Sequence, residues 1–218
     1  MRKILFIICW ALAGVGLYSC SLDEPSYGKT TSDNYYQKES DIEQALTGAY
    51  LQLRTTWNEY ALNHYFVGDC STDDALKGGG NDGDRAEVRD LSDFTIYTTN
   101  GEVGRRWEIL YRLINRCNDV IYYAPDAIGN EELLKRYANE AKALRAFGYY
   151  CLVTTFGEVP LITTPMQPAE ILQIPRSPLE KVYECIVSDL TDASALPAKG
   201  DYLSLIHISE PTRPLYIS

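Results

Sequence analysis

The chain has 218 residues, with 30 acidic and 20 basic side chains and a formal net charge of −10. This acidic balance argues against nucleic acid as a partner, because binding to a phosphate backbone requires clustered Lys and Arg. The length suits one or two ordinary domains.

The N-terminus has the pattern of an export signal. Arg2 and Lys3 precede an apolar run over residues 4–16, which is shorter than the roughly 20 residues that span a bilayer. The following "LYSC" places Leu17 three residues before Cys20 and resembles the lipobox of bacterial lipoproteins. We expect residues 1–19 to be a lipoprotein signal peptide and residues 20–39 a tether lipidated at Cys20. An ordinary signal peptide with an incidental cysteine is the alternative.

The C-terminus has a different character. The stretch "LSLIHISEPTR" at residues 203–213 has no helical or strand period, and it matches the codon-by-codon translation of a transposase adapter used in sequencing libraries. We therefore expect residues 203–218 to be an adapter-derived, non-native tail, and residues 40–202 to be a truncated N-terminal domain. A natural polar C-terminal segment is the alternative.

Apolar residues spaced three and four apart predict a first helix. Ser40 and Glu43 form a capping-box pattern that marks its start. A second helix is predicted from about Gly104 to Tyr123, before Pro125. The expected buried stripes are Ile42, Ala45, Leu46, Ala49, Tyr50 and Leu53 in the first, and Trp107, Leu110, Tyr111, Ile114, Cys117 and Ile121 in the second.

A third helix is predicted from about Asn130 to about residue 156, with Gly157 as its C-cap. The "SPLE" at residues 177–180 predicts a fourth, with Ser177 as its N-cap. The expected buried stripes are Leu133, Tyr137, Ala141, Leu144, Phe147 and Cys151, then Leu179, Val182, Tyr183, Ile186, Leu190 and Ala193. Short polar connections favour antiparallel pairs, so we predict a mainly α fold of helical hairpins with long loops.

Two regions, residues 68–100 and 157–176, are predicted to be non-helical, and residues 159–164 of the second read as a short extended segment. The glycine-rich stretch at residues 77–85 lacks the order of a phosphate loop, because its lysine precedes the glycines. The "NDGD" at residues 81–84 lacks the spacing of a calcium-binding EF-hand. Long loops on a rigid scaffold are nevertheless natural places for function.

No complete catalytic or metal-binding pattern is found. Two of Asp69, Asp73 and Asp74 would serve as a glycosidase acid and base only across a cleft, about 5 Å or 6.5–9.5 Å apart, and solvated carboxylates are commoner. Cysteines 70, 117, 151 and 185 lack metal-ligand spacing, and the last three fall on apolar helix faces as small buried side chains. A disulfide among the four stays open. We expect no enzyme, no cofactor and no metal.

Aromatic side chains flank the acidic loop. Flat rings stack on sugar faces while Asp, Asn and Arg bond the hydroxyl groups, and packing between helices is the alternative role for each ring. The residues that flank the loop are Trp57, Tyr60, Tyr65, Phe66 and Tyr97. From loop position alone, the candidate ligand-binding residues are Asp73, Asp74, Arg85, Tyr97 and Asn100.

Five ordered segments resemble SusD/RagB-like lipoproteins, and together they cover roughly residues 20–199. The most specific is "EAKALRAFGYYCLVTTFGEVPLIT" at residues 140–163. The others are "IEQALTGAYLQLR" (42–54), "VGDCSTDDA" (67–75), "WEILYRLINRCNDVI" (107–121) and "SPLEKVYECIVSDLTDASALP" (177–197).

The resemblance implies a fold of tetratricopeptide-like helix pairs and a lipid-anchored protein at the outer-membrane cell surface. It also implies non-catalytic binding of an oligosaccharide, or in some members a peptide, as the lid of a SusC-like TonB-dependent transporter. Glu140 and Arg145 are expected to be structural, and much of the glycan pocket is expected in the later half of such proteins. A helical-repeat scaffold that binds peptides or a partner protein is the alternative, and a glycoside hydrolase is a weaker one.

Overall fold

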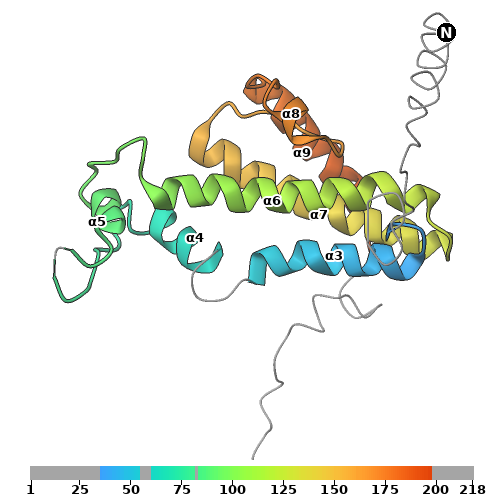
Figure 1. Ribbon diagram of the computed structural model, residues 1–218, viewed down its shortest axis with the longest axis horizontal. Coiled ribbons are helices and arrows are strands. Elements are labelled where there is room, and N and C mark those ends of the chain that lie inside the picture. Colours follow the sequence, from blue (N-terminus) through green and yellow to red (C-terminus); the bar gives the residue numbers. More distant parts are fainter. Residues whose placement is uncertain (1–34, 55–59, 82, 198–218) are drawn as a thin grey trace, which may run out of the picture. The chain divides into compact units, whose positions relative to one another are not determined.

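The computed structural model describes residues 35–54, 60–81 and 83–197 (Figure 1). Within them lie α3 (Glu39–Arg54), α4 (Tyr60–Gly68), α5 (Ala86–Ser92), α6 (Gly101–Tyr123), the 3-10 turn η1 (Ala124–Asp126), α7 (Glu131–Phe156), α8 (Pro168–Ile171) and α9 (Leu179–Ala193). The signal peptide, Cys20, most of the tether and the expected foreign tail lie outside the described residues. None of the described helices is long and apolar enough to cross a membrane. The predicted mainly α fold is confirmed.

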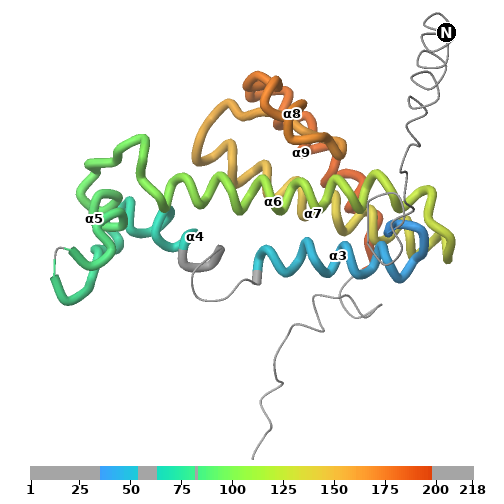
Figure 2. The backbone as a smooth tube through the Cα atoms, in the orientation of Figure 1, coloured from blue at the N-terminus to red at the C-terminus, as the bar shows by residue number. Residues whose placement is uncertain are grey.

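The long helices α6 and α7 form an antiparallel hairpin at the centre of this arrangement (Figure 2). Helix α3 packs along one side of the pair, and α9 packs on α7 from the other side (Figure 1). The first core cluster joins α3 to the hairpin through Ile42, Leu46, Ala49, Leu113, Cys117, Val120, Tyr137, Ala141 and Leu144. The second joins the hairpin to α9 through Leu110, Ile114, Tyr149, Leu152, Val159, Val182 and Ile186.

Two asparagines fix where the central helices begin. The Asn100 Oδ1 accepts hydrogen bonds from the backbone N–H groups of Glu102 and Val103, at 3.0 and 3.2 Å. Asn130 caps α7 in the same way, and the helix begins next to it, close to the predicted start. Since Asn100 satisfies amides that otherwise lack a partner at a helix start, α6 begins three residues earlier than the apolar spacing indicated.

The predicted N-caps of the first and last helices are wrong. Helix α3 begins at Glu39, and the backbone N–H of Lys38 donates to the Asp41 carboxylate at 2.9 Å, so Asp41 takes the role expected of Glu43. The backbone N–H of Ser177 donates to the Val159 carbonyl at 3.0 Å, which leaves Pro178 to precede α9.

The buried stripe of α9 also differs from the prediction. Val182 and Ile186 are buried, whereas Leu179, Tyr183 and Leu190 are 40%, 42% and 51% exposed. The contact face is instead centred near the buried Asp189 carboxylate, which pairs with Arg145 of α7. An apolar side of α9 therefore faces no other described element. Phe147 of α7, also predicted to be buried, is 39% exposed.

The region 68–100, predicted to be non-helical, contains α5. Its Val88 and Leu91 are buried with Phe66 and Cys70 in a small third cluster. A seven-residue helix depends on such tertiary packing, so its periodicity in the sequence is too short to indicate it. The predicted extended segment after Gly157 amounts to one antiparallel bridge between Val159 and Ser177, with no longer strand in the described part. Gly157 itself has a φ of 72° and ends α7, as predicted.

A buried polar network ties α7, α9 and α6 to the segment after Gly157. The Arg145 guanidinium makes two 2.8 Å hydrogen bonds to Asp189, a third of 2.8 Å to the Asn118 Oδ1, and one of 3.0 Å to the Thr163 carbonyl. The Tyr149 hydroxyl donates to the Ile162 carbonyl and accepts from the Ile162 N–H, at 2.8 and 2.7 Å. The structural role expected of Arg145 is confirmed.

Glu140 takes part in a second buried contact, between α7 and α3. The Tyr50 hydroxyl donates to its carboxylate at 2.9 Å, and the Arg136 Nε lies 3.5 Å away. Burial raises the pKa of Glu140, and these two partners oppose the rise. Its expected structural role is confirmed as well.

Candidate functional site

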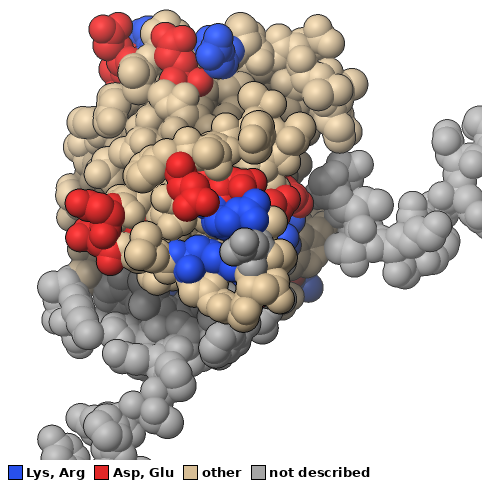
Figure 3. Space-filling view, turned by 90° about the vertical axis from the view of Figure 1, so that its left-hand side faces the viewer, with Lys and Arg blue, Asp and Glu red and all other residues tan. Residues whose placement is uncertain are grey.

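The candidate residues from the loop lie at the end of the hairpin that carries α4 and α5. Figure 3 faces this end, where acidic and basic side chains lie next to one another among uncharged residues. Because α4 and α5 are short and the segments between them are long, this end presents more loop surface than the helical middle. It is the part of the described chain with the mixture of rings and charges expected of a polar-ligand site.

Asn100 and Arg85 meet at the buried Glu102, in the first turn of α6. The Asn100 Oδ1 accepts from the Glu102 N–H, and its Nδ2 donates to the Glu87 carbonyl at 2.9 Å. The Arg85 Nη1 lies 3.8 Å from the Glu102 carboxylate, and the Arg85 guanidinium lies 4.9 Å from the centre of the Phe66 ring. The carboxamide of Asn100, 5% exposed, is therefore already engaged, whereas Arg85 remains partly open to solvent.

Glu102 and Asn63 complete this cluster and escaped the sequence analysis. The Asn63 Nδ2 donates to the backbone carbonyl and the carboxylate of Glu102, at 2.7 and 3.2 Å. The two residues lie in different helices and carry no motif, so no sequence signal pointed to them. Their contacts hold α4 against the start of α6 and fix the base of the loops.

The other three candidates are exposed. The Tyr97 ring is 66% exposed, and Asp73 and Asp74 lie on the surface of the segment after α4. The backbone N–H of Asn100 donates to the Tyr97 carbonyl at 3.0 Å, but within the described residues no side chain of the three bonds to Arg85 or Asn100. The fold thus brings Arg85 and Asn100 together and leaves Tyr97, Asp73 and Asp74 as separate surface groups.

A second site, missed by the sequence analysis, lies between α6 and the segment after α7. A pocket of about 380 Å³ is lined by Trp107, Tyr111, Asn115, Pro160, Ile171 and Leu172, among others. The Tyr111 hydroxyl donates to the Pro160 carbonyl at 2.7 Å and holds the far wall in place. The spacing of Trp107, Tyr111 and Asn115, four residues apart, places them on one face of a helix and could have indicated this pocket. From their apolar spacing, the two rings are instead predicted to lie in the buried core.

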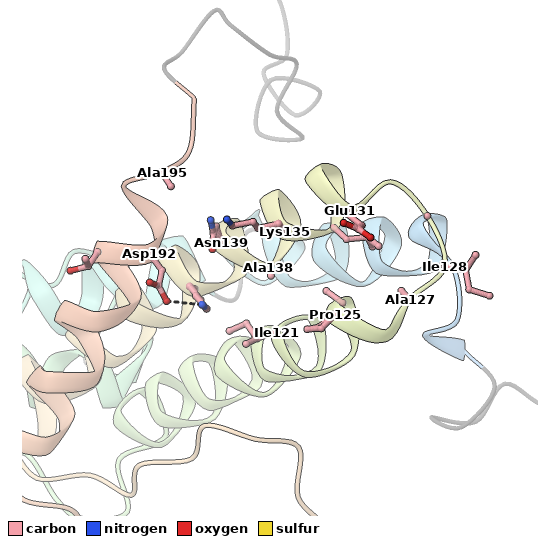
Figure 4. A pocket seen from close by; sticks show the side chains of 15 residues that line it. Ile121, Pro125, Ala127, Ile128, Glu131, Lys135, Ala138, Asn139, Asp192 and Ala195 are labelled. Carbon is pink, nitrogen blue, oxygen red and sulfur yellow. Dashed lines mark hydrogen bonds and ion pairs between the residues drawn. The ribbon is translucent and has the colours of Figure 1, made fainter.

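A third hollow, of about 870 Å³, lies at the opposite end of the hairpin, between the last turn of α6, the first half of α7 and the end of α9 (Figure 4). No aromatic side chain lines it. Lys142 and Asp192 bridge its edge through an ion pair of 2.6 Å, and the pKa of the Asp192 carboxyl is lowered by its hydrogen bond to Lys142.

The described residues contain no group of three His, Cys, Asp or Glu side chains that could hold a metal ion. His64 instead faces Arg106, whose Nη1 lies 3.2 Å from its Nδ1. Cys70, Cys117 and Cys151 are buried, Cys185 is partly buried, and none of the four is in a disulfide within the described part.

Comparison with known proteins decides the family. Residues 21–211 match the profile of the SusD-like family, described as "Starch-binding associating with outer membrane". The chain belongs to this family. A SusD-like protein, P2, of Formosa agariphila is 29% identical over 225 residues, which cover 95% of this chain and 43% of that protein.

Solved SusD-like structures agree with the fold. A laminarin-binding SusD-like protein is 32% identical, with a TM-score of 0.66 over 72% of this chain and 34% of its own length. The surface glycan-binding protein A of Bacteroides fluxus is 28% identical, with a TM-score of 0.60 over 73% of this chain and 33% of its own. The chain therefore spans about a third of these solved SusD-like proteins and less than half of the curated one.

Proposed function

We propose that this protein is the N-terminal part of a non-catalytic, surface-exposed lipoprotein that binds oligosaccharides and delivers them to a SusC-like TonB-dependent transporter. The observation that carries the proposal is the family match over residues 21–211. A relative at 32% identity binds laminarin, so β-glucan oligosaccharides of that kind are the first ligands to test.

The proposed binding surface is the α4–α5 end. Its Tyr97 offers an exposed ring for a sugar face, while Asp73, Asp74 and Arg85 offer groups for the hydroxyls. Asn100 contributes by fixing the start of α6, because its carboxamide already bonds three backbone groups. A complete site would also include residues from the part of a full-length protein that this chain does not span.

The binding test uses the protein encoded by the uninterrupted gene and titration calorimetry with laminarihexaose and a panel of other glycans. Loss of one aromatic contact of about 1.4 kcal/mol weakens binding about tenfold, which is the effect expected of Tyr97→Ala. The matched control is Tyr122→Ala, because Tyr122 is 55% exposed at the far end of α6. Equal affinities of the two variants would refute the proposed surface.

The Trp107 pocket is the second location to test. Asn115→Asp changes a group at this pocket without truncating either ring. If this variant loses glycan binding while Tyr97→Ala retains it, the site moves to the pocket and the function stands. If no glycan binds and a peptide library does, the scaffold alternative replaces the glycan proposal.

The absence of catalysis is tested on the same panel. Release of shorter sugars that disappears in an Asp73→Asn, Asp74→Asn double variant would establish a hydrolase. We expect no turnover, because these carboxylates are exposed sequence neighbours and not a pair that faces across a cleft.

The proposed anchor and partner are tested in cells. Acyl chains contribute about 0.8 kcal/mol per buried methylene, so a lipidated Cys20 would hold the protein on the outer membrane. We expect Cys20→Ser to move the protein from the membrane fraction to the soluble fraction, while Cys9→Ser, within the signal, leaves it in place. Copurification of the native protein with a large outer-membrane transporter tests the SusC-like partner.

A further inference from the structure

The third hollow is a groove beside the α6–α7 loop, and it continues the surface of α7 on which α9 lies. Helix α9 packs on α7. Thr191 and Asp192 in the last turn of α9, with Ala195 just after it, form one wall of the groove (Figure 4). Beyond that wall, the floor is formed by Ile121 and Ala138, which also pack against the first core cluster. The hairpin thus presents a further length of its packing face that no described element covers.

Asn139 of α7 is the unusual residue in this groove. Its side chain lines the groove and is 8% exposed, yet it has no hydrogen-bond or ion-pair partner in the described part of the chain (Figure 4). The amide oxygen and nitrogen of Asn139 are not fully enclosed, and they are accessible from the groove. A polar side chain buried to this extent usually bonds to another protein group, and an occupant of the groove would supply that group in place of water.

The lining indicates which occupant. A carboxamide presents a donor and an acceptor side by side, and the C=O and N–H groups of an extended polypeptide match this pair. The absence of aromatic side chains from the lining disfavours a sugar ring. An apolar floor with charged groups at its edge, here Lys135 and the Lys142–Asp192 pair, is the usual composition of a protein–protein contact.

The source of the polypeptide follows from chain length. The matched part of this chain covers 34% and 33% of two solved relatives, so about two thirds of a protein of that size lies outside the matched part and could pack on the hairpin. We propose that the groove is an internal docking site for a segment from that remaining part, and that the Asn139 carboxamide hydrogen-bonds the backbone of this segment.

Thiol labelling tests the occupant. Lys135 and Glu132 are both exposed on the first turns of α7, but only Lys135 lines the groove. In the native protein from the uninterrupted gene, we expect Lys135→Cys to react with a maleimide at least tenfold more slowly than Glu132→Cys. In the 218-residue chain we expect similar rates. Similar rates in the longer protein would overturn the proposal, as would slow labelling that becomes fast on dilution of a dimer, because a second copy would then fill the groove.

A truncation of the amide tests the hydrogen bonds. We expect Asn139→Ala to lower the Tm of the longer protein by several degrees and to leave the Tm of the 218-residue chain unchanged or raised. Gln173→Ala, which removes an exposed amide after α8, is the control and should change neither. An equal effect of Asn139→Ala in both chains would overturn the proposal. Neither experiment measures glycan binding, so their failure is separate from failure of the proposed function.

Discussion

The middle of the hairpin and its α4–α5 end are held together in different ways. In the middle, helix faces with regular apolar spacing meet, and the buried network of Arg145, Asp189 and Asn118 joins three helices to one loop. At the α4–α5 end, short helices depend on side-chain bonds to the backbone, such as those of Asn63 and Asn100. The first arrangement produces a rigid scaffold, and the second leaves rings and charges of the loops at the surface.

This difference places the main stabilising contacts and the proposed binding surface in separate parts of the molecule. Substitutions in the middle should change the free energy of unfolding strongly, because they leave buried polar groups without partners. Substitutions at the α4–α5 end should change it less, and those of exposed loop residues should affect mainly ligand binding. Four predicted changes in stability test this difference, and they are given in order of decreasing size.

The largest effect is expected for Arg145→Met. This change leaves the buried Asp189 carboxylate without its cation and should lower the free energy of unfolding by about 3–5 kcal/mol, measured by urea denaturation. The control is Lys181→Met, which removes an ion pair with Glu184 that is 65% exposed on each side and should leave the urea midpoint almost unchanged. The double variant Arg145→Met, Asp189→Leu should recover part of the loss, and no recovery would contradict an electrostatic origin.

A smaller effect is expected for Tyr149→Phe. The change removes the hydroxyl that bonds both backbone groups of Ile162, and leaving them buried should cost about 1–3 kcal/mol. The neighbouring Tyr150 is 53% exposed, so Tyr150→Phe is a matched control with almost no expected change in the urea midpoint. If the two variants are equally stable, the loop after Gly157 is not held by Tyr149.

The two N-caps compare the α4–α5 end with the opposite end of the hairpin, where α7 begins. Loss of an N-cap side chain costs about 0.5–2 kcal/mol. Asn100→Ala should fall near the upper limit, because Asn100 is buried and also bonds Glu87, whereas Asn130→Ala should fall near the lower limit at an exposed position. A larger loss for Asn130→Ala would show that the α4–α5 end contributes less to stability than its bonds indicate.

The smallest effect concerns pH. Burial raises the pKa of Glu140 above its ordinary value of 4.5, so the native state holds this proton to higher pH than the unfolded state does. The contribution of Glu140 to stability is therefore fully present below pH 4.5 and falls as pH rises through the native pKa. Urea midpoints of wild type and Glu140→Gln, measured from pH 4.5 to 7, should show a downward slope for wild type that is weaker in the variant. Parallel curves would contradict this assignment.

Much of the fold could be predicted from local spacing. Helix α7 and its C-cap at Gly157 agree with the sequence prediction, because long amphipathic helices repeat the same signal over several turns. Helix α5 and the N-cap of α9 could not be predicted in this way. Their geometry depends on Phe66 and Val159, which come from other parts of the chain.

The candidate site was less predictable than the fold. Loop position drew attention to Arg85 and Asn100, but only the folded chain shows that Glu102 brings them together. It also shows that the Tyr97 ring remains exposed, and that Trp107 and Tyr111 border a pocket. A residue type indicates what a side chain can bond, whereas the tertiary contacts determine which of its groups are still available.

The family resemblance, the central helices and the structural roles of Glu140 and Arg145 could therefore be predicted from the sequence alone. Those features can be recognised locally, because each depends on residue types at spacings of a few residues. The tertiary structure decided that Arg145 pairs with Asp189, that one apolar side of α9 stays uncovered, and that Asn139 faces a groove without a partner. These outcomes depend on contacts between residues far apart in the chain, whose geometry no local pattern specifies.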